Sequence, residues 1–255
     1  MLAVVDGTND GLSHGNSVGA RFWQGLGDCT RSVHGACSIT SCPPDGGADP
    51  PFRGESASAG GLVFTGFKFV TGIGDNDGTT LEHPYYGSTS PRPTQMWTGG
   101  ETIAVSATGG EVPAFNASVA APSPFTVSLP SCASSECSID IDRTSPLVFE
   151  WTSGPVGDVV VTLGVYGWRY LDEQPFMTRI RIAQLDCHYP NDVGGATLEP
   201  QVLGLLPPVT VTSEPPFDDA FLTVSRRTAT SLTQEAGIIK FEVQWVARRG
   251  PATLF

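Results

Sequence analysis

Apolar and polar residues alternate along most of the chain after residue 60. In the clearest run, 239–245, every second residue is apolar. The same period of two recurs at 103–107, 125–129, 139–142, 147–151 and 222–225. This period is typical of antiparallel strands with one buried and one solvated face. Short strands separated by Gly and Pro turns predict an antiparallel β-sandwich, immunoglobulin-like or jelly-roll-like, over residues 61–255.

Two stretches depart from this pattern. Residues 198–206 have apolar side chains at helical spacing, which predicts one or two helical turns. Residues 1–60 are dominated by Gly, Pro, Asp and Ser clusters with little alternation. Three cysteines also lie in this first stretch. We therefore expect an irregular N-terminal extension that is stapled to the sandwich by disulfides, not a separate domain.

The chain contains six cysteines, at positions 29, 37, 42, 132, 137 and 187. An even number favours disulfides and an oxidising compartment. Zinc is the alternative, because Cys37/Cys42 and Cys132/Cys137 are each separated by four residues. Our preferred pairing joins Cys132 to Cys137, which leaves Cys187 for Cys29, Cys37 or Cys42. A bridge from Cys137 to Cys187 across the core, with an immunoglobulin-like spacing around Trp151, is also open.

The net charge of the chain indicates which classes of partner are disfavoured. With 26 acidic and 14 basic residues the net charge is −12, which disfavours nucleic acid and anionic membranes. No run of about 18 apolar residues predicts a transmembrane helix. The N-terminus reaches Asp6 too soon for the apolar core of a signal peptide. The disulfides and the few charges nevertheless predict an extracellular or outer-surface protein whose signal peptide is absent from this chain.

The order of motifs in the second half resembles a known group. WTGGETIAVSATGGEVPAF (97–115) is followed by a PSPFT strand (122–126), SPLVFEW (145–151), LDCHYP (185–190) and VLGLLP (202–207). Over about residues 97–250 the chain resembles uncharacterised exported, lipoprotein-like proteins of myxobacteria and their relatives. The resemblance implies location and fold but no catalytic residues. We expect protein-specific function in the insertions at 72–93 and 166–179, because function concentrates in loops.

The segment 74–82 is the strongest chemical candidate. Asp75, Asn76, Asp77 and Glu82 place carboxyl and amide oxygens close together in a Gly-bounded turn. Such oxygens suit Ca²⁺, although the twelve-residue EF-hand pattern is incomplete. An Asx-rich turn without metal is the alternative. Apart from this calcium, the sequence indicates no cofactor.

Six aromatic residues lie in or beside predicted loops. Such rings stack on sugars or anchor protein partners, and the alternative is that they cap the ends of the sandwich. They are Tyr85, Tyr86, Trp97, Tyr166, Trp168 and Tyr170.

Three functions are compatible with these features. The favoured one is a non-enzymatic surface protein, either a structural subunit that self-assembles or a protein-interaction module. Its final strand, 237–247, would add to a partner sheet if it lies at an edge. The second is a polysaccharide-binding module that uses the aromatic residues, with or without calcium. A secreted hydrolase ranks last, because the G-x-S-x-G at 15–19 has no strand before it and no helix after it.

Overall fold

The described part of the chain folds into three β-sheets and one short helix. The computed structural model describes residues 2–10, 16–23, 29–42, 59–67, 71–73, 86–90, 96–131, 138–170, 177–190, 193–209, 218–234 and 237–255. The all-β prediction is confirmed. The predicted helical turn is also confirmed, as α1 (Pro200–Leu203). No described helix has the length and apolar character needed to cross a membrane.

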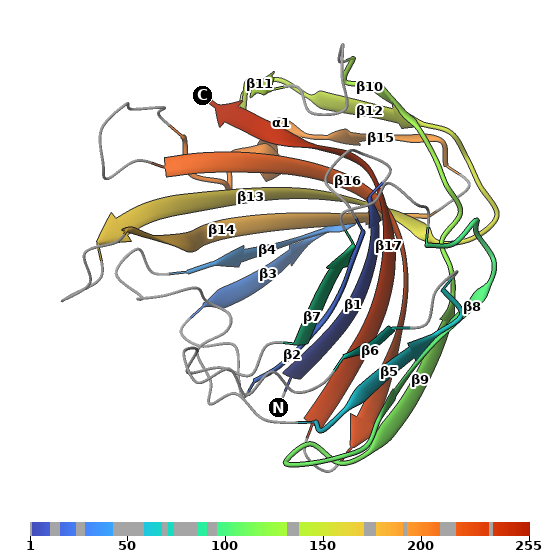
Figure 1. The fold of residues 1–255 in the computed structure, drawn as a ribbon. Coiled ribbons are helices and arrows are strands. Elements are labelled where there is room, and N and C mark those ends of the chain that lie inside the picture. Colours follow the sequence, from blue (N-terminus) through green and yellow to red (C-terminus); the bar gives the residue numbers. More distant parts are fainter. Residues whose placement is uncertain are drawn as a thin grey trace.

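A ten-stranded sheet forms the body of the molecule. Its order is β3 (Thr30–His34), β4 (Cys37–Ser41), β14 (Met177–Tyr189), β13 (Asp158–Tyr170), β16 (Asp218–Gln234), β17 (Gly237–Leu254), β1 (Leu2–Asp10), β2 (Asn16–Trp23) and β7 (Tyr86–Ser90). The short strand β11 (Ile139–Ile141) pairs with the far end of β17. The sheet curls strongly along its long strands (Figure 1).

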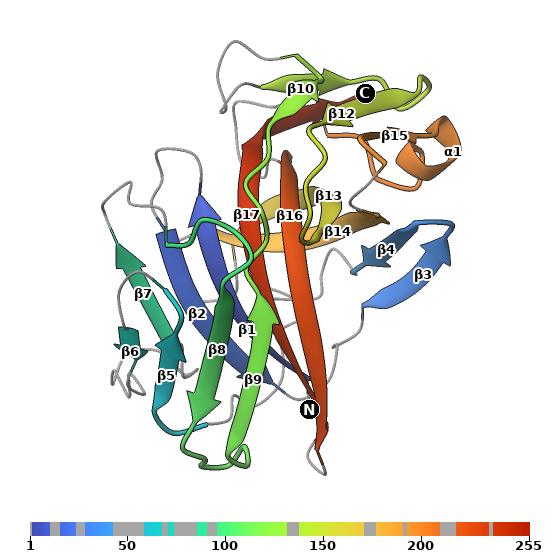
Figure 2. The same ribbon diagram turned by 90° about the vertical axis from the view of Figure 1, so that its right-hand side faces the viewer.

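Two smaller sheets lie on the outer, convex side of this curl (Figures 1 and 2). One is formed by β6 (Thr71–Ile73), β5 (Leu62–Thr65), β8 (Thr102–Ala107) and β9 (Phe115–Ala120). The other is formed by β10 (Val127–Leu129), β12 (Leu147–Trp151) and β15 (Gly195–Leu198).

The core fills the space between the large sheet and the two small ones. The ring centroids of Phe64 on β5 and Phe241 on β17 are 6.5 Å apart. Trp151 on β12 contacts Tyr189 on β14 at 5.8 Å. Along these strands buried side chains alternate with exposed ones, so the period of two gives the sheets one buried apolar face. Whether the layers make an immunoglobulin-like or a jelly-roll-like sandwich stays a prediction.

Two buried arginines fasten the chain where it passes from one small sheet to the other. Arg226 on β16 donates to the carbonyl oxygens of Ser123 (3.3 Å), Pro124 (3.2 Å) and Thr152 (2.7 Å). Its guanidinium also lies 4.6 Å from the ring centroid of Phe125. Further along the same passage, Arg248 donates to the carbonyl oxygens of Val127 (3.4 Å) and Pro130. Among the described residues, backbone carbonyl oxygens thus accept the hydrogen bonds of these two cationic groups.

The prediction of an irregular N-terminal extension over residues 1–60 is wrong for the described part of that stretch. Strands β1 to β4 all belong to the ten-stranded sheet, and β1 lies well inside it. The strongly patterned β17 supplies a pairing partner for β1, so tertiary context overrides the weak local signal. The prediction of purely antiparallel sheets is also wrong, because β17 pairs in parallel with both β1 and β11.

Candidate functional site

The metal prediction lies outside the described residues. This applies to Asp75, Asn76, Asp77 and Glu82, and to Tyr85 among the aromatics. Where the structure describes the chain, no three His, Cys, Asp or Glu side chains gather as a metal-ligand set. The calcium site therefore stays a prediction from the sequence.

The remaining aromatics come from different parts of the described chain. Trp97 is fully buried and donates from its indole nitrogen to the Pro122 carbonyl oxygen at 3.1 Å, so the prediction that it meets a ligand is wrong. Tyr86 belongs to β7, and Tyr166, Trp168 and Tyr170 belong to β13. The half-buried Tyr166 ring packs edge-on against Phe221 at 6.5 Å. Tyr86 begins β7 and Tyr170 ends β13, and the binding role of these aromatics stays a prediction.

Two disulfides connect the first strands to the body. Cys29 pairs with Cys42 across the β3–β4 hairpin, and Cys37 pairs with Cys187. The prediction that Cys187 joins an N-terminal cysteine is confirmed, and the alternative bridge from Cys137 to Cys187 is wrong. Because the sulfurs of Cys37 and Cys42 are in disulfides, they are not zinc ligands. Cys132 and Cys137 lie outside the described residues, so their pairing stays a prediction.

The hairpin held by these disulfides ends the large sheet. Strand β3 is the outermost strand, and every residue in it is exposed. Within the described part of the chain, no strand pairs with its outer side. Val33 is 71% exposed, the largest value among the exposed large apolar side chains of this part. The other end of the sheet is β7. The final strand β17 is interior, between β16 and β1, so the condition under which it would add to a partner sheet is not met.

The pairing of the hairpin defines which backbone groups face outward. Ala36 and Cys42 bond to β14 through the pairs His188 N–Ala36 O (2.9 Å) and Cys42 N–Ile182 O (2.8 Å). Because successive residues point their backbone groups to opposite sides, the intervening positions 37, 39 and 41 face β3. Their partners are His34, Ser32 and Thr30. Arg31 and Val33 therefore direct their N–H and C=O groups away from the sheet.

A Ser–His contact lies on the same strand. The Ser32 hydroxyl and the His34 Nε2 are 2.9 Å apart, and both residues are exposed. Catalytic serines share this contact, but in a triad the histidine also bonds to a carboxylate. Among the described residues, no carboxylate contacts His34. The pair alone does not amount to a hydrolytic site.

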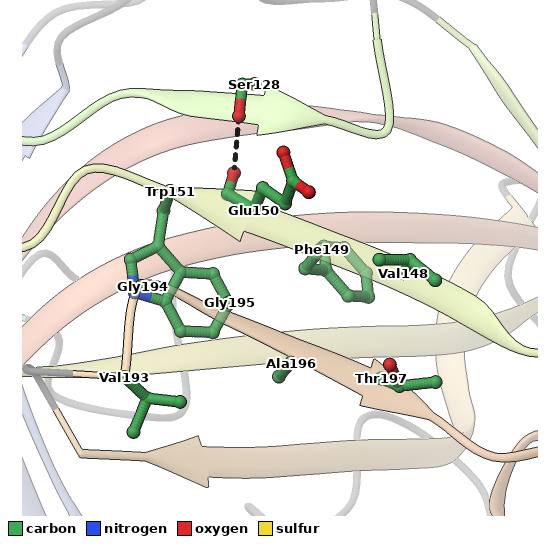
Figure 3. Close-up of a pocket in the computed structure, with 10 residues that line it drawn as sticks. All are labelled: Ser128, Val148, Phe149, Glu150, Trp151, Val193, Gly194, Gly195, Ala196 and Thr197. Carbon is green, nitrogen blue, oxygen red and sulfur yellow. Dashed lines mark hydrogen bonds between the residues drawn. The ribbon is translucent and has the colours of Figure 1, made fainter.

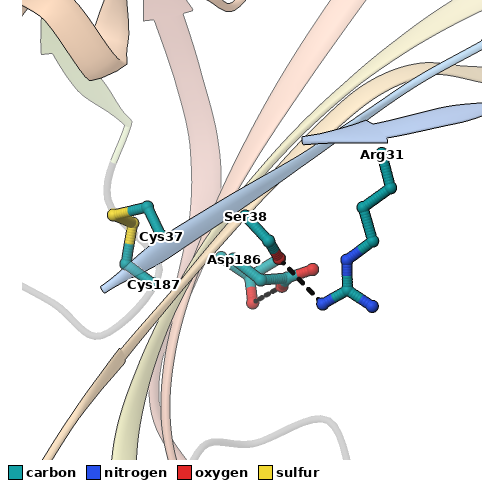
Figure 4. The surroundings of a disulfide bond; sticks show 6 residues. Arg31, Cys37, Ser38, Asp186 and Cys187 are labelled. Carbon is teal, nitrogen blue, oxygen red and sulfur yellow. Dashed lines mark hydrogen bonds between the residues drawn. A yellow bond between two sulfur atoms is a disulfide. The ribbon is translucent and has the colours of Figure 1, made fainter. Parts of the chain in front are cut away.

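Polar side chains cross the face of the large sheet opposite the core. Asp186 accepts from Thr162 Oγ1 (2.7 Å) and Gln184 Nε2 (2.6 Å). Figure 4 shows Asp186, Ser38 and Arg31 on one side of the strands and the Cys37–Cys187 disulfide on the other. Arg31 Nη2 donates to Ser38 Oγ at 3.0 Å. Polar and charged side chains thus continue along this face as far as Arg31 on the edge strand β3.

Further along this face, Glu242 is buried between two cations. Arg227 lies 3.3 Å away, and Lys240 forms a second ion pair with it. Burial acts to raise the pKa of Glu242, but Arg227 and Lys240 together hold it below its ordinary value. The pKa of His188 is lowered by burial and by Arg227, against the opposing effect of Asp186. Each carboxylate here has its partners inside the network, so we assign the network a structural role.

A shallow hollow opens on the three-stranded sheet. It has a volume of about 500 Å³ and is lined from β10, β12 and β15 (Figure 3). Val148 and Val193 contribute apolar side chains that are 44% and 56% exposed. Ser128, Glu150 and Thr197 contribute exposed polar groups. None of these five residues carries a motif that sequence reasoning detects, because their spacing is ordinary strand alternation.

The described part of the molecule thus presents an edge strand held by two disulfides, a polar sheet face and a hollow on a small sheet. Comparison of the chain with known protein families and with curated proteins finds no match.

Proposed function

We propose that this protein is a non-enzymatic, exported interaction module that takes up a strand of a protein partner at the outer edge of β3. The exposed, unpaired β3 at the end of the described sheet is the observation that carries the proposal. An open edge offers N–H and C=O groups in register to a partner strand. Here Arg31 and Val33 present those groups, and the Val33 side chain adds apolar contact area.

Soluble proteins normally guard such edges with proline, lysine, bulges or a covering segment. Strand β3 contains no proline or lysine, and its pairing with β4 continues without a register shift from Thr30 to His34. Two disulfides hold the hairpin on both sides. Holding an edge rigid in its bound conformation lowers the entropy lost on association. The edge strand is therefore suited to pairing with a partner strand, and its rigidity favours one specific partner over non-specific aggregation.

Export is supported by the same disulfides, since such bonds persist in oxidising compartments. The resemblance of residues 97–250 to exported, lipoprotein-like proteins agrees with this location. The charge of the β3–β4 hairpin indicates which class of partner strand would bind it. Residues 29–42 contain one arginine and no acidic residue in a chain of net charge −12. A strand with acidic flanks, from a surface protein or from another copy of this chain, is the best complement.

The test exploits the alternation of backbone groups in β3. Val33→Pro removes an N–H that faces outward and leaves the pairs with β4 in place, whereas Val33→Thr keeps that N–H. We expect the native particle isolated from the cell surface to lose mass by light scattering in the proline variant only. A photo-reactive side chain at Val33 should also form a cross-link that one at the exposed Val63 does not. Equal masses together with equal cross-linking would refute the proposal.

A further inference from the structure

The concave face of the large sheet, opposite the core, carries two neighbouring aromatic rings. On β13 and β16 the core side is occupied by residues such as Leu163 and Leu222, so the alternate residues face the concave side. There the ring of Tyr166 on β13 meets the ring of Phe221 on β16 edge-on, with the two centroids 6.5 Å apart. Both residues are partly exposed. Apolar ring surface is thus within reach of solvent on this face.

A glycine positions the Tyr166 ring. Gly164 on β13 pairs with Phe221, and a Cβ at Gly164 would lie 2.7 Å from Cε2 and 2.9 Å from the hydroxyl oxygen of Tyr166. Any larger residue at 164 would therefore displace this ring. The guanidinium of Arg181, the residue of β14 that pairs with Tyr166, lies 5.7 Å from the ring centroid, within the range of a cation–π contact. The Tyr166 ring is thus held against the sheet beside Phe221.

Polar side chains continue this face across the neighbouring strands β14, β13 and β16 (Figure 1). Gln184 on β14 lies opposite Gly164 and donates from Nε2 to Asp186 at 2.6 Å. Asp186 also accepts from Thr162 at 2.7 Å, so the carboxylate is fixed and orients the Gln184 amide. That amide keeps its carbonyl oxygen and its second N–H hydrogen for a ligand. Thr223 on β16, opposite Thr162, adds a partly exposed hydroxyl.

We propose that the concave face of β14, β13 and β16 binds a neutral saccharide chain. A sugar unit has C–H faces that pack on aromatic rings and hydroxyls that both donate and accept hydrogen bonds. One C–H face would pack on Phe221 and Tyr166, while hydroxyls would bond to the Gln184 amide and the Thr223 hydroxyl. The curl of the sheet gives this face the concave shape that is usual for a ligand site (Figure 1).

The chemistry of this face favours a neutral sugar over a protein or an anionic polymer. The centre of a protein interface is poor in charged residues. Here guanidinium, carboxylate, amide and hydroxyl groups surround the two rings. The carboxylates of Asp186 and Asp219, which is paired with Tyr166 on this face, disfavour an anionic ligand, as does the net charge of −12.

This site does not depend on the proposed function. Strand β4 lies between the outermost strand β3 and the strands that carry the site. A protein that pairs with a partner strand at its edge and holds a glycan on its concave face would link a surface protein to a polysaccharide coat. Val33→Pro, which tests the edge, should leave saccharide binding unchanged, so either activity can fail without the other.

The test measures binding of neutral hexasaccharides to the whole protein by calorimetry, with the NMR signals of the Gln184 side-chain amide as a local readout. The probes are cellohexaose, maltohexaose and laminarihexaose at up to about 10 mM, with polygalacturonate as the anionic comparison. We expect one neutral probe to bind and to shift the Gln184 amide signals, assigned with Gln184→Ala. That variant should bind about fivefold more weakly, the cost of one neutral hydrogen bond. Asn116→Ala, which removes an exposed amide from β9, is its matched control and should bind as the wild type does.

The aromatic contact has its own pair of variants. Phe221→Ala should weaken binding about tenfold, and Phe221→Tyr, which keeps the ring, should bind nearly as the wild type does. If Phe221→Ala unfolds, the pair Gln184→Ala and Asn116→Ala decides the test. The proposal is overturned if no neutral probe binds, if Gln184→Ala binds as tightly as Asn116→Ala, or if polygalacturonate binds more tightly than every neutral probe. A loss of native particle mass in Gln184→Ala without any saccharide binding would overturn it in favour of a protein partner.

Discussion

Cys37 on β4 lies directly opposite Cys187 on β14, and their disulfide joins residues 150 positions apart in the sequence. Cys187 is fully buried and Cys37 is nearly so. The bond lies on the core side of the sheet, while the exposed edge strand β3 is the next strand outward. The second disulfide, Cys29–Cys42, closes the open end of the same hairpin. The edge strand is thus held to the body by covalent bonds where its own apolar burial is small.

Removing Cys37–Cys187 should cost more stability than removing Cys29–Cys42. In the chain-entropy account, a disulfide closing 150 residues contributes about 5 kcal/mol and one closing 13 residues about 3 kcal/mol. We expect Cys37→Ala/Cys187→Ala to lower the free energy of unfolding more than Cys29→Ala/Cys42→Ala, measured by urea denaturation. The reverse order would show that the short bridge, and not the long one, holds the hairpin in place.

Arg226→Lys should destabilise the protein by about 3 kcal/mol, because one ammonium cannot reach the carbonyl oxygens of Ser123, Pro124 and Thr152 together. Arg143→Lys is the matched control, since Arg143 makes one such bond within the described residues, to the Leu206 carbonyl oxygen at 2.8 Å. There we expect a loss of about 1 kcal/mol. Urea denaturation of both variants checks the difference, and similar losses would mean that the three bonds of Arg226 do not act together.

The sequence predicts strands well where one face is buried and the other is wet. Runs such as 103–107 and 147–151 correspond to β8 and β12. The sequence predicts strands poorly where a strand forms through pairing with distant strands and has no alternating pattern of its own. Strand β1 reads LAVVDGTND, with four polar residues, and it pairs with β17 and β2. Such long-range pairing leaves no local periodicity, so the place of β1 to β4 in the large sheet could not be predicted.

Candidate sites were less predictable than strands. Trp97 carries a turn-like flank, WTGGE, that suggests an exposed loop, yet the fold buries its ring against Phe67 at 5.8 Å. The GGE that contributes to the resemblance forms a capped turn, with Glu101 accepting from the backbone N–H groups of Thr98 and Gly99. The exposure of β3 depends on the strand order of the whole sheet, which no local motif encodes.

Calcium at residues 74–82 has a direct test. If Asp75, Asn76, Asp77 and Glu82 bind Ca²⁺, then calcium at about 100 times its dissociation constant stabilises the folded state by about 2.7 kcal/mol. We expect the melting temperature to rise on adding calcium and to fall with a chelator. Asp75→Asn/Asp77→Asn should abolish that dependence. A melting temperature indifferent to calcium in the wild type would leave 74–82 as an Asx-rich turn.

Glu101 should make the stability of the protein depend on acid pH. Burial raises the pKa of its carboxyl group, but hydrogen bonds from the Thr98 hydroxyl and from the N–H groups of Thr98 and Gly99 outweigh it and lower that pKa from 4.5 to about 2. The folded-state pKa lies below the unfolded one, so ionised Glu101 stabilises the fold. Its contribution is complete above about pH 4.5 and is lost as the pH falls toward 2.

Glu101→Gln removes this contribution. We expect the urea midpoint of the variant to fall below that of the wild type at pH 6, and the difference to shrink steadily between pH 4.5 and 2. Glu111→Gln, which removes an exposed negative charge nearby in the sequence, controls for net charge. Because Glu101 is partly exposed, solvent screening keeps the effect modest. A constant difference across this range would mean that the turn at 98–101 depends on shape and not on the charge of Glu101.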